Sequence, residues 1–339
     1  MSKVVAARLA LVCLMFAATS AVFAAGGEEE ATATDPLRIG YSDWPGWVAW
    51  EVGIQKGWFE EAGVAVQFEW FEYVPSLDAF AAGQIDAVAV TNGDALVNAS
   101  TGAPGIMILI NDYSNGNDMV VARPGIGSVE ELVGGRVGVE VGFVAHLLFL
   151  KAIEEAGLSQ DQFEVINVAT HQTPEVLATG EVDAIAAWQP NSGQALRALA
   201  GSTAIFTSAD VPGLIYDTLA VSPTSLAERR EDWKAVVAVW YRIADYIKDE
   251  ANRDEVLEIM SARVNLSPDD YAGFLDGTYL LSLQEAIDVL GQDEGLGTLY
   301  GSSLESDAFN VQYEVYPEPL NVAEFIDPSL MLELYEETR

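Results

Sequence analysis

The stretch Ala82-Gly83-Gln84-Ile85-Asp86-Ala87-Val88-Ala89 decides the fold, because it returns about a hundred residues later as Thr179-Gly180-Glu181-Val182-Asp183-Ala184-Ile185-Ala186. Two shorter motifs recur in the same order, Arg38-Ile39-Gly40 as Arg136-Val137-Gly138 and Glu60-Glu61-Ala62-Gly63 as Glu154-Glu155-Ala156-Gly157. A glycine that closes a helix before a strand is common chemistry, so one such match would mean little. Three matches in register predict two α/β lobes of like topology. Two lobes imply a cleft, and a cleft implies a ligand.

The N-terminus has the pattern of a secretory signal peptide. Lys3 and Arg8 precede an apolar run that ends at Val22-Phe23-Ala24. Such a segment is too short to span a bilayer and too apolar for a globular N-terminus. We therefore expect residues 1–24 to be a signal peptide, 25–36 a polar leader, and the protein to be periplasmic or otherwise extracytoplasmic. Lipid attachment at Cys13 is the alternative, but Leu11-Val12 before it lacks the small residues of such sites.

Several kinds of chemistry are excluded by composition. Cys13 is the only cysteine and lies in the expected signal peptide, and His146 and His171 are the only histidines. We therefore expect no disulfide, no cysteine nucleophile and no metal site. The sequence also shows no Ser-His-Asp order, Gly-rich phosphate loop or metal-ligand spacing, so we expect no catalytic residues, no cofactor and no enzyme activity. The chain has 52 acidic and 16 basic residues and a formal net charge of −36, which excludes nucleic acid and anionic membranes as partners. A hydrated surface suited to a salty medium is the simplest account of this charge.

Strands alternate with helices along the chain, which predicts an α/β fold with a doubly wound, mostly parallel sheet in each lobe. The expected strands are 37–41, 64–71, 85–90, 106–110, 119–122, 137–141, 163–168, 185–188, 204–207 and 218–221. The expected helices are 48–62, 75–82, 146–156, 174–178, 232–249, 254–263, 268–274, 283–290 and 326–335. The first part of lobe 1 is then 37–119, lobe 2 is 120–218, and 219–339 is a helical second part of lobe 1. Two crossings between lobes predict hinge closure around a ligand.

Four motifs carry a resemblance to a known family, and it covers essentially the whole chain after the signal peptide. They are Leu37-Arg38-Ile39-Gly40-Tyr41, Gly57-Trp58-Phe59-Glu60-Glu61-Ala62-Gly63-Val64, Ala82-Gly83-Gln84-Ile85-Asp86-Ala87 and Val129-Glu130-Glu131-Leu132-Val133-Gly134-Gly135-Arg136-Val137-Gly138-Val139. With them the chain resembles the periplasmic substrate-binding proteins of ABC importers in the nitrate, sulfonate and taurine group, which is related to thiamine-precursor synthases. The resemblance implies a type II periplasmic-binding fold, a small-molecule solute, a membrane permease as partner, and a monomer.

The resemblance also implies where the ligand lies, on loops at the carboxyl ends of strands from both lobes, as open α/β sheets generally have it. Here those loops are 42–47, 91–96, 140–146 and 188–191, with 111–118 and 216–217 as additions. The segments around them hold no lysine and no arginine, and His146 is the only candidate cation. They hold seven acids: Asp43, Asp94, Asp112, Asp118, Glu140, Asp210 and Asp217.

Tryptophans accompany these acids. Trp44, Trp47 and Trp50 follow the first strand, and the repeat register places Trp188 of lobe 2 opposite Thr91 of lobe 1. Indole faces and carboxylates suit a small organic cation, through cation–π contact and paired N–H donors. This version of the family also resembles binding proteins encoded beside guanidine- and urea-carboxylase genes, so guanidinium is the leading ligand. The candidate ligand-binding residues are Asp43, Trp44, Trp47, Glu72, Thr91, Asp94, Asp118, Glu140, His146, Trp188 and Asp217.

Structural roles compete with several of these assignments. Asp43, Asp94 and Glu140 each lie where an acid before a helix accepts hydrogen bonds from the free N–H groups, so helix capping is the alternative role for these three. Trp47 and Trp50 lie on the first expected helix, where they can simply pack lobe 1. Two other functions also stay open. One is a taurine, sulfonate or nitrate binder that holds an oxoanion with Thr91, His146 and backbone N–H groups. The other is an enzyme on the same fold.

Overall fold

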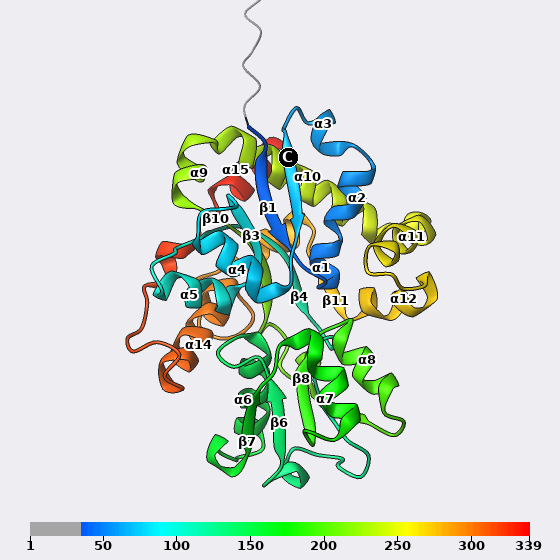
Figure 1. The fold of residues 1–339 in the computed structure, drawn as a ribbon. Helices are drawn as coiled ribbons and strands as arrows, with labels where there is room; N and C mark the ends of the chain where they lie inside the picture. Colours follow the sequence, from blue (N-terminus) through cyan, green and yellow to red (C-terminus); the bar gives the residue numbers. More distant parts are fainter. Residues whose placement is uncertain (1–34) are drawn as a thin grey trace, which may run out of the picture. The chain divides into compact units, whose positions relative to one another are not determined.

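The computed structural model describes residues 35–339, which form one compact unit built around two sheets (Figure 1). The first sheet has the strand order β11-β4-β10-β3-β1-β2. Its strands are β1 (Leu37–Tyr41), β2 (Val66–Trp70), β3 (Ala87–Thr91), β4 (Ile106–Ser114), β10 (Tyr216–Val221) and β11 (Thr278–Leu280). We refer to this sheet and its helices as lobe 1.

The second sheet, the centre of lobe 2, has the order β7-β6-β8-β5-β9. Its strands are β5 (Met119–Ala122), β6 (Arg136–Val139), β7 (Glu164–Asn167), β8 (Ala184–Ala187) and β9 (Thr203–Thr207). The chain passes between the sheets twice, through residues 115–118 and 208–215. The boundaries expected at 119/120 and 218/219 thus fall inside β5 and β10.

The predicted α/β class is confirmed, but the sheets are mixed. In lobe 1, β1 pairs in parallel with β2 and β3, whereas β10 runs antiparallel to both β3 and β4. Lobe 2 repeats this plan, with β6 parallel to β7 and β8, and β5 antiparallel to β8 and β9. The reason lies in the crossings, because β5 and β10 each enter their sheet from the other lobe instead of through a helical crossover.

Helices cover both sheets. Lobe 2 carries α6 (Val144–Glu155), α7 (Thr173–Thr179) and α8 (Asn191–Ala198). Lobe 1 carries α1 (Pro45–Val48), α2 (Trp50–Gln55), α3 (Trp58–Glu61), α4 (Tyr73–Ala81), α5 (Asn92–Ser100), α9 (Pro223–Glu228), α10 (Arg230–Lys248), α11 (Arg253–Arg263), α12 (Pro268–Asp276), α13 (Leu283–Asp288), α14 (Leu299–Gln312) and α15 (Ser329–Glu337).

The single helix expected over 48–62 is three short helices, α1, α2 and α3. Gly57, with φ of +70°, separates α2 from α3 in a backbone conformation that favours glycine. At other helices, the first turn is capped by the side chain of a threonine or serine that precedes the helix. Thr91 Oγ1 accepts the backbone N–H of Asp94 at the start of α5, and Ser222 does the same for Ser225 at α9.

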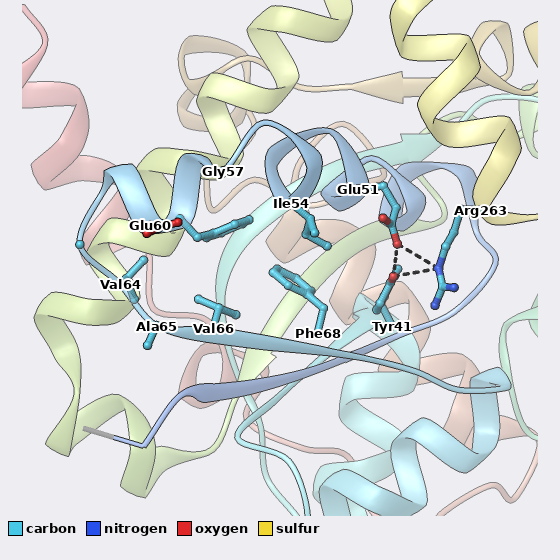
Figure 2. A pocket seen from close by; sticks show the side chains of 12 residues that line it. Tyr41, Glu51, Ile54, Gly57, Glu60, Val64, Ala65, Val66, Phe68 and Arg263 are labelled. Atoms are coloured by element: carbon cyan, nitrogen blue, oxygen red, sulfur yellow. Dashed lines mark hydrogen bonds and ion pairs between the residues drawn. The ribbon is translucent and has the colours of Figure 1, made fainter. Parts of the chain in front are cut away.

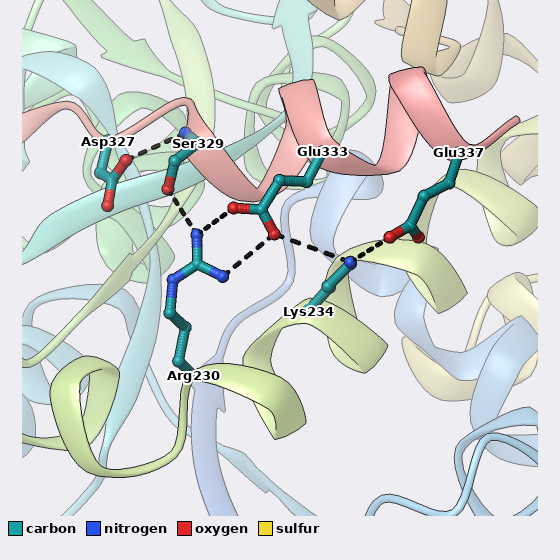
Figure 3. Close-up of polar contacts among 6 residues, drawn as sticks. All are labelled: Arg230, Lys234, Asp327, Ser329, Glu333 and Glu337. Atoms are coloured by element: carbon teal, nitrogen blue, oxygen red, sulfur yellow. Dashed lines mark hydrogen bonds and ion pairs between the residues drawn. The ribbon is translucent and has the colours of Figure 1, made fainter. Parts of the chain in front are cut away.

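The C-terminal helix α15 is joined to α10 by ion pairs, which Figure 3 shows, and it also has a buried apolar face. Arg230 Nη2 lies 2.6 Å from Glu333 Oε1, and Lys234 Nζ lies 2.6 Å from Glu337 Oε1. Beneath these exposed pairs the side chain of Leu330 is fully buried. Because β1, β3, β6 and β8 are almost wholly buried, both sheets are rigid supports for the loops at their carboxyl ends.

Candidate functional site

A buried cavity lies between the two lobes, and we refer to it as the inner cavity. It has a volume of about 10 Å³, which is room for about one water molecule. It is lined by Trp44, Trp47, Tyr73, Thr91, Asp118, Val144, Trp188, Ile215 and Asp217. Trp44 follows β1, Thr91 ends β3 and Trp188 follows β8. The cavity therefore lies at the carboxyl ends of parallel strands of both sheets, where open α/β sheets bind ligands.

Two acids line the inner cavity, Asp118 and Asp217, and we call them the cavity carboxylates. Asp118 is 3% exposed and Asp217 is 1% exposed. A third acid, the fully buried Asp112, lies beside Asp217 on the neighbouring strand and accepts a hydrogen bond of 3.0 Å from Trp44 Nε1. Among the described residues, the Oδ2 atoms of Asp112 and Asp217 have no hydrogen-bond partner. Within residues 35–339, no lysine or arginine lines this cavity.

Burial dominates the electrostatics of these acids, because it disfavours the ionised form. It raises the pKa of Asp118 to about 7 and the pKa of Asp112 to about 7. The pKa of Asp217 is raised well above its ordinary value, first by burial and then by the negative charges of Asp112 and Asp118. Without a cation, burial and mutual repulsion therefore oppose the simultaneous ionisation of these three carboxyl groups.

Three aromatic rings form a continuous wall of the inner cavity. Trp47 and Tyr73, both of lobe 1, stack with their centroids 5.3 Å apart and an interplanar angle of 24°. Trp188 of lobe 2 meets Tyr73 edge-on, at 5.3 Å and 80°. Each ring is at most 4% exposed. This arrangement offers aromatic surface from both lobes to a bound molecule.

Asp43 and Asp94 lie next to the inner cavity but do not line it. Asp43 accepts hydrogen bonds from Trp188 Nε1 (3.2 Å) and Asn191 Nδ2 (3.1 Å), both in lobe 2. Asp94 Oδ2 accepts from Tyr73 OH (2.7 Å) and from the backbone N–H of Val144 (3.3 Å). Burial raises the pKa of Asp43 to about 6 and the pKa of Asp94 to about 7. Asp94 thus does accept a hydrogen bond from the N-terminus of a helix, but this helix is α6 of lobe 2.

Glu72 and Glu140 line a second cavity, which we call the outer cavity, with a volume of about 220 Å³. Tyr73 and Trp188 line both cavities and so form the wall between them. Glu72 Oε2 lies 3.4 Å from His171 Nδ1, and Glu140 Oε2 accepts a hydrogen bond of 2.9 Å from Thr170 Oγ1. Neither glutamate reaches the inner cavity.

His146 is not a cation in this structure. It is 5% exposed, and burial lowers its pKa to about 4, so its ring is neutral at neutral pH. Its Nδ1 accepts a hydrogen bond of 3.3 Å from the backbone N–H of Gly142. His146 lines a separate small cavity beside α6 instead of the inner cavity. The structure therefore brings together Trp44, Trp47, Thr91, Asp118, Trp188 and Asp217 from the predicted set.

Sequence reasoning missed three residues of the inner cavity, Tyr73, Val144 and Ile215, and it did not select the adjacent Asp112. Tyr73 was detectable, since it follows β2 at the same sheet edge as Trp44 and Thr91. Val144 and Ile215 carry no chemical signal of their own. The prominence of Asp112 depends on strand register, because β4 and β10 place it beside Asp217.

A larger groove lies on the outside of lobe 1, with a volume of about 720 Å³ (Figure 2). Its only arginine, Arg263, is already satisfied: Arg263 Nε lies 2.9 Å from Glu51 Oε1 and 3.0 Å from Tyr41 OH. The Arg263 guanidinium also lies 4.1 Å from the centroid of the Trp70 ring. This groove borders the edge strand β2 and is separate from the inner cavity. It does show how this chain holds a guanidinium, with a carboxylate and an aromatic face.

Comparison with known proteins identifies the family. The model of the NMT1-like family matches residues 30–261, more than half of the chain. The chain belongs to the NMT1-like family. A Brucella abortus relative, named as a candidate binding protein, is 25% identical over 228 residues, covering 66% of this chain and 70% of its own.

Solved structures agree on the fold. The periplasmic aliphatic sulphonate binding protein SsuA from Escherichia coli matches with a TM-score of 0.71 and 17% identity, over 88% of this chain and all of its own. The desulfurization enzyme DSZB matches with a TM-score of 0.67 and 15% identity, over 90% of this chain and all of its own. The periplasmic-binding-protein fold of this chain is therefore shared by binding proteins and by at least one enzyme, so the fold alone does not exclude catalysis.

Within residues 35–339 no group of three or more histidine, cysteine, aspartate and glutamate side chains has the arrangement of a metal site. The same part of the chain contains no helix with the length and apolarity needed to cross a bilayer.

Proposed function

We propose that this protein is the extracytoplasmic solute-binding component of an ABC uptake transporter, and that its two lobes close on a small nitrogenous cation, with guanidinium as the best candidate. The observation that carries the ligand assignment is the inner cavity itself. Among residues 35–339, its polar lining consists of the carboxyl groups of Asp118 and Asp217, the hydroxyls of Thr91 and Tyr73 and the indole N–H groups of three tryptophans, with no basic side chain. The transport role is supported by the family and by the fold.

The charge of the cavity favours a cation. A buried carboxylate is stable only when it is paired with a positive charge or supplied with hydrogen-bond donors. Asp217 Oδ2 has neither within the described residues. A ligand with N–H donors and one positive charge supplies both to the cavity carboxylates, which makes the ionised forms of Asp118 and Asp217 favourable.

Guanidinium matches this site in shape and in donor pattern. It is planar, it offers N–H donors in a fork that suits carboxylates, and it stacks on aromatic rings. Trp44, Trp47 and Trp188 provide indole surface, and cation–π contact contributes on the order of 2 kcal/mol when both partners are desolvated. The small volume of the inner cavity, about 10 Å³ in this structure, favours a ligand of few atoms and requires the cavity walls to move outward when the ligand binds. The Arg263 guanidinium is held elsewhere in the chain by the same combination of groups.

A sulfonate, taurine or nitrate ligand is the alternative, since SsuA shares the fold and is a sulphonate binding protein. Such an anion would need free N–H donors at a helix N-terminus. The N–H of Val144, the first residue of α6, already donates to the Asp94 carboxylate. An anion would also lie against Asp118 and Asp217. Within residues 35–339, Trp47 Nε1 is a donor without a partner in this cavity. We nevertheless prefer a cation, because an anion would meet two carboxyl groups and no basic side chain among the described residues that line the cavity.

The test is thermal melting of the purified mature protein against guanidinium, methylguanidine, urea, choline, taurine, nitrate and sulfate at constant ionic strength. A ligand at a hundredfold excess over its dissociation constant adds about 2.7 kcal/mol of stability. We expect a shift with guanidinium that disappears in Asp217→Asn. A shift with taurine or nitrate alone would keep the binding role and contradict the cation assignment. Turnover of any bound solute would point to an enzyme like the structural neighbour DSZB.

We also propose that the protein is a monomer and that it delivers its solute to a membrane permease. The periplasmic location rests on the expected signal peptide, whose residues 1–24 lie outside the described part of the chain. Cys13 and residues 25–34 of the expected leader also lie outside the described residues. Mass spectrometry of the mature protein from its native membrane fraction separates cleavage after Ala24 from lipid attachment at Cys13.

A further inference from the structure

The carboxyl groups around the inner cavity fall into two sets. Asp118 and Asp217 line the cavity, whereas Asp43 and Asp94 do not. Instead, Asp43 and Asp94 both belong to lobe 1 and accept hydrogen bonds from N–H donors of lobe 2. We call these two the closure carboxylates. The closure carboxylates thus connect the two lobes instead of facing the inner cavity. The sequence alone predicted the same ligand-binding role for all four aspartates.

Asp43 engages lobe 2 with both carboxylate oxygens. Oδ1 accepts from Trp188 Nε1 at 3.2 Å, and Oδ2 accepts from Asn191 Nδ2 at 3.1 Å. Trp188 is at the same time a wall of the inner cavity and touches the ring of Tyr73. The indole is therefore held at one edge by Asp43 and supported by Tyr73. Asp43 can fix the orientation of the ring over the cavity without touching what the cavity contains.

Asp94 engages lobe 2 through the backbone of α6. The first N–H groups of a helix have no partner within the helix, and a negative charge near them is favourable. Val144 is the first residue of α6, and its N–H lies 3.3 Å from Asp94 Oδ2. Tyr73 OH donates to the same oxygen at 2.7 Å, which orients the carboxylate toward lobe 2. Opening of the lobes breaks the contact with Val144 but leaves the contact with Tyr73 within lobe 1.

We propose that Asp43 and Asp94 are positioning residues that hold lobe 2 closed over the inner cavity and thereby slow the escape of a bound solute. The part of this proposal that concerns solute escape rests on the proposed function. A solute enters the open form, in which these interlobe bonds are not made. It leaves only after the three interlobe hydrogen bonds of Asp43 and Asp94 have broken. The closure carboxylates therefore act on dissociation, and the cavity carboxylates act on affinity as a whole.

The experiment measures guanidinium binding by stopped flow with the mature protein and with Asp43→Asn, Asp94→Asn and Asn191→Ala. Asn191→Ala removes one donor from lobe 2 and leaves every acid in place. The matched control is Asp78→Asn, which removes an exposed charge on the outer cavity. We expect koff to rise about tenfold or more in the three variants, with kon changed less than about threefold, as is usual when contacts made after encounter are lost. The control should behave as the unaltered protein.

A double-mutant cycle adds a readout that general destabilisation does not produce. Asp43→Asn and Trp188→Phe remove opposite ends of one hydrogen bond, so their effects on koff should not be additive. Additive effects, or a fall in kon with koff unchanged, would overturn the proposal. Circular dichroism identifies any variant that fails to fold, and Asn191→Ala then still tests Asp43 from the other lobe.

Small-angle X-ray scattering separates failure of this inference from failure of the proposed function. If the unaltered protein binds no cation of the panel, the proposed ligand class is wrong, and closure is still measurable without ligand. In that case Asp43→Asn and Asp94→Asn should each increase the radius of gyration relative to Asp78→Asn. An unchanged radius together with unchanged koff would contradict a role in closure.

Discussion

Asp112 of β4 and Asp217 of β10 are direct partners in the antiparallel register of the two strands, and both are essentially inaccessible to solvent. Two carboxyl groups at this proximity cannot both ionise without a cation, so they bind and release protons as a unit. Asp118 adds a third negative charge that raises the pKa of Asp217. The ligand-free protein thus keeps protons in its interior that a bound cation displaces.

Replacing Asp217 separates ligand binding from stability. In Asp217→Asn we expect guanidinium affinity to fall at least about a hundredfold, the equivalent of 2.7 kcal/mol, because a buried charge partner is lost. We also expect the ligand-free variant to resist urea better at pH 8, by about 1 to 3 kcal/mol, because a repulsive charge is gone. Calorimetric titration and urea denaturation measure the two effects. A loss of stability with unchanged affinity would assign Asp217 to the fold alone.

The ligand-free protein should lose stability as pH rises from about 4 to about 7. Burial raises the pKa of Asp94 and Asp118 from 3.8 in the unfolded chain to about 7. Between these values the native state binds more protons than the unfolded state, so the free energy of unfolding falls as pH increases. His146 acts in the opposite direction below its unfolded pKa of 6.5, but it is one group against several. Urea denaturation at pH 5, 6, 7 and 8 checks the slope.

Affinity for a cation should depend on pH with the opposite sign. Carboxyl groups must release their protons to pair with guanidinium, so binding tightens as pH rises toward 7. Each proton released on binding changes affinity by about tenfold per pH unit below the pKa. Titration calorimetry in two buffers of different ionisation enthalpy counts the released protons. A pH-independent affinity between 5.5 and 8 would show that the site is already ionised when empty.

Gly46 is required by the position of Asp112. A Cβ atom at Gly46 would lie 1.8 Å from Asp112 Oδ2 and 2.7 Å from Trp44 Nε1. We expect Gly46→Ala to push the carboxyl aside, break the Trp44–Asp112 hydrogen bond, and cost about 1 to 3 kcal/mol of stability. The control is Gly273→Ala in α12, where nothing lies within 4 Å of the new Cβ and where alanine should be neutral or stabilising. Equal behaviour of the two variants in urea denaturation would contradict this packing argument.

The attachment of α15 should depend on its apolar face more than on its ion pairs. Leu330 is fully buried, and we expect Leu330→Ala to cost about 2 to 5 kcal/mol of unfolding free energy. Glu333 pairs with Arg230, but both side chains are about 40% exposed, so Glu333→Ala should cost at most about 1 kcal/mol. Urea denaturation compares the two. A larger loss from Glu333→Ala would make the ion pairs in Figure 3 the main attachment.

The repeated motifs predicted the α/β class because each motif reports a local event, a buried strand or a glycine after a helix. Gly63, Gly83, Gly157 and Gly180 all have positive φ, as such positions require. Strand direction is not local: β5 and β10 run antiparallel because of the path between sheets, and no pattern within those strands encodes that path. The expected parallel character of the sheets failed for this reason.

In the candidate site, too, local features were predictable from the sequence and contacts between distant segments were not. Trp44, Thr91 and Trp188 were found because each directly follows or ends a strand of the repeat. The different uses of Asp43 and Asp118 were not predictable from sequence, since both are acids in loops after strands. What separates them is contact with the other lobe, which arises only when the two sheets are brought together.

The two cavity carboxylates come from the two places where the chain crosses between sheets. Asp118 is the last residue before β5, and Asp217 is the second residue of β10. A cation bound by these two carboxylates would therefore lie next to the segments about which the lobes move, whereas Asp43 and Asp94 bond directly from lobe 1 to lobe 2. Residues next to a hinge are displaced least when lobes open, so the cavity carboxylates can stay in contact with a cation during much of the opening. Release of the cation would then require the two lobes to open widely, beyond the point at which the interlobe hydrogen bonds break.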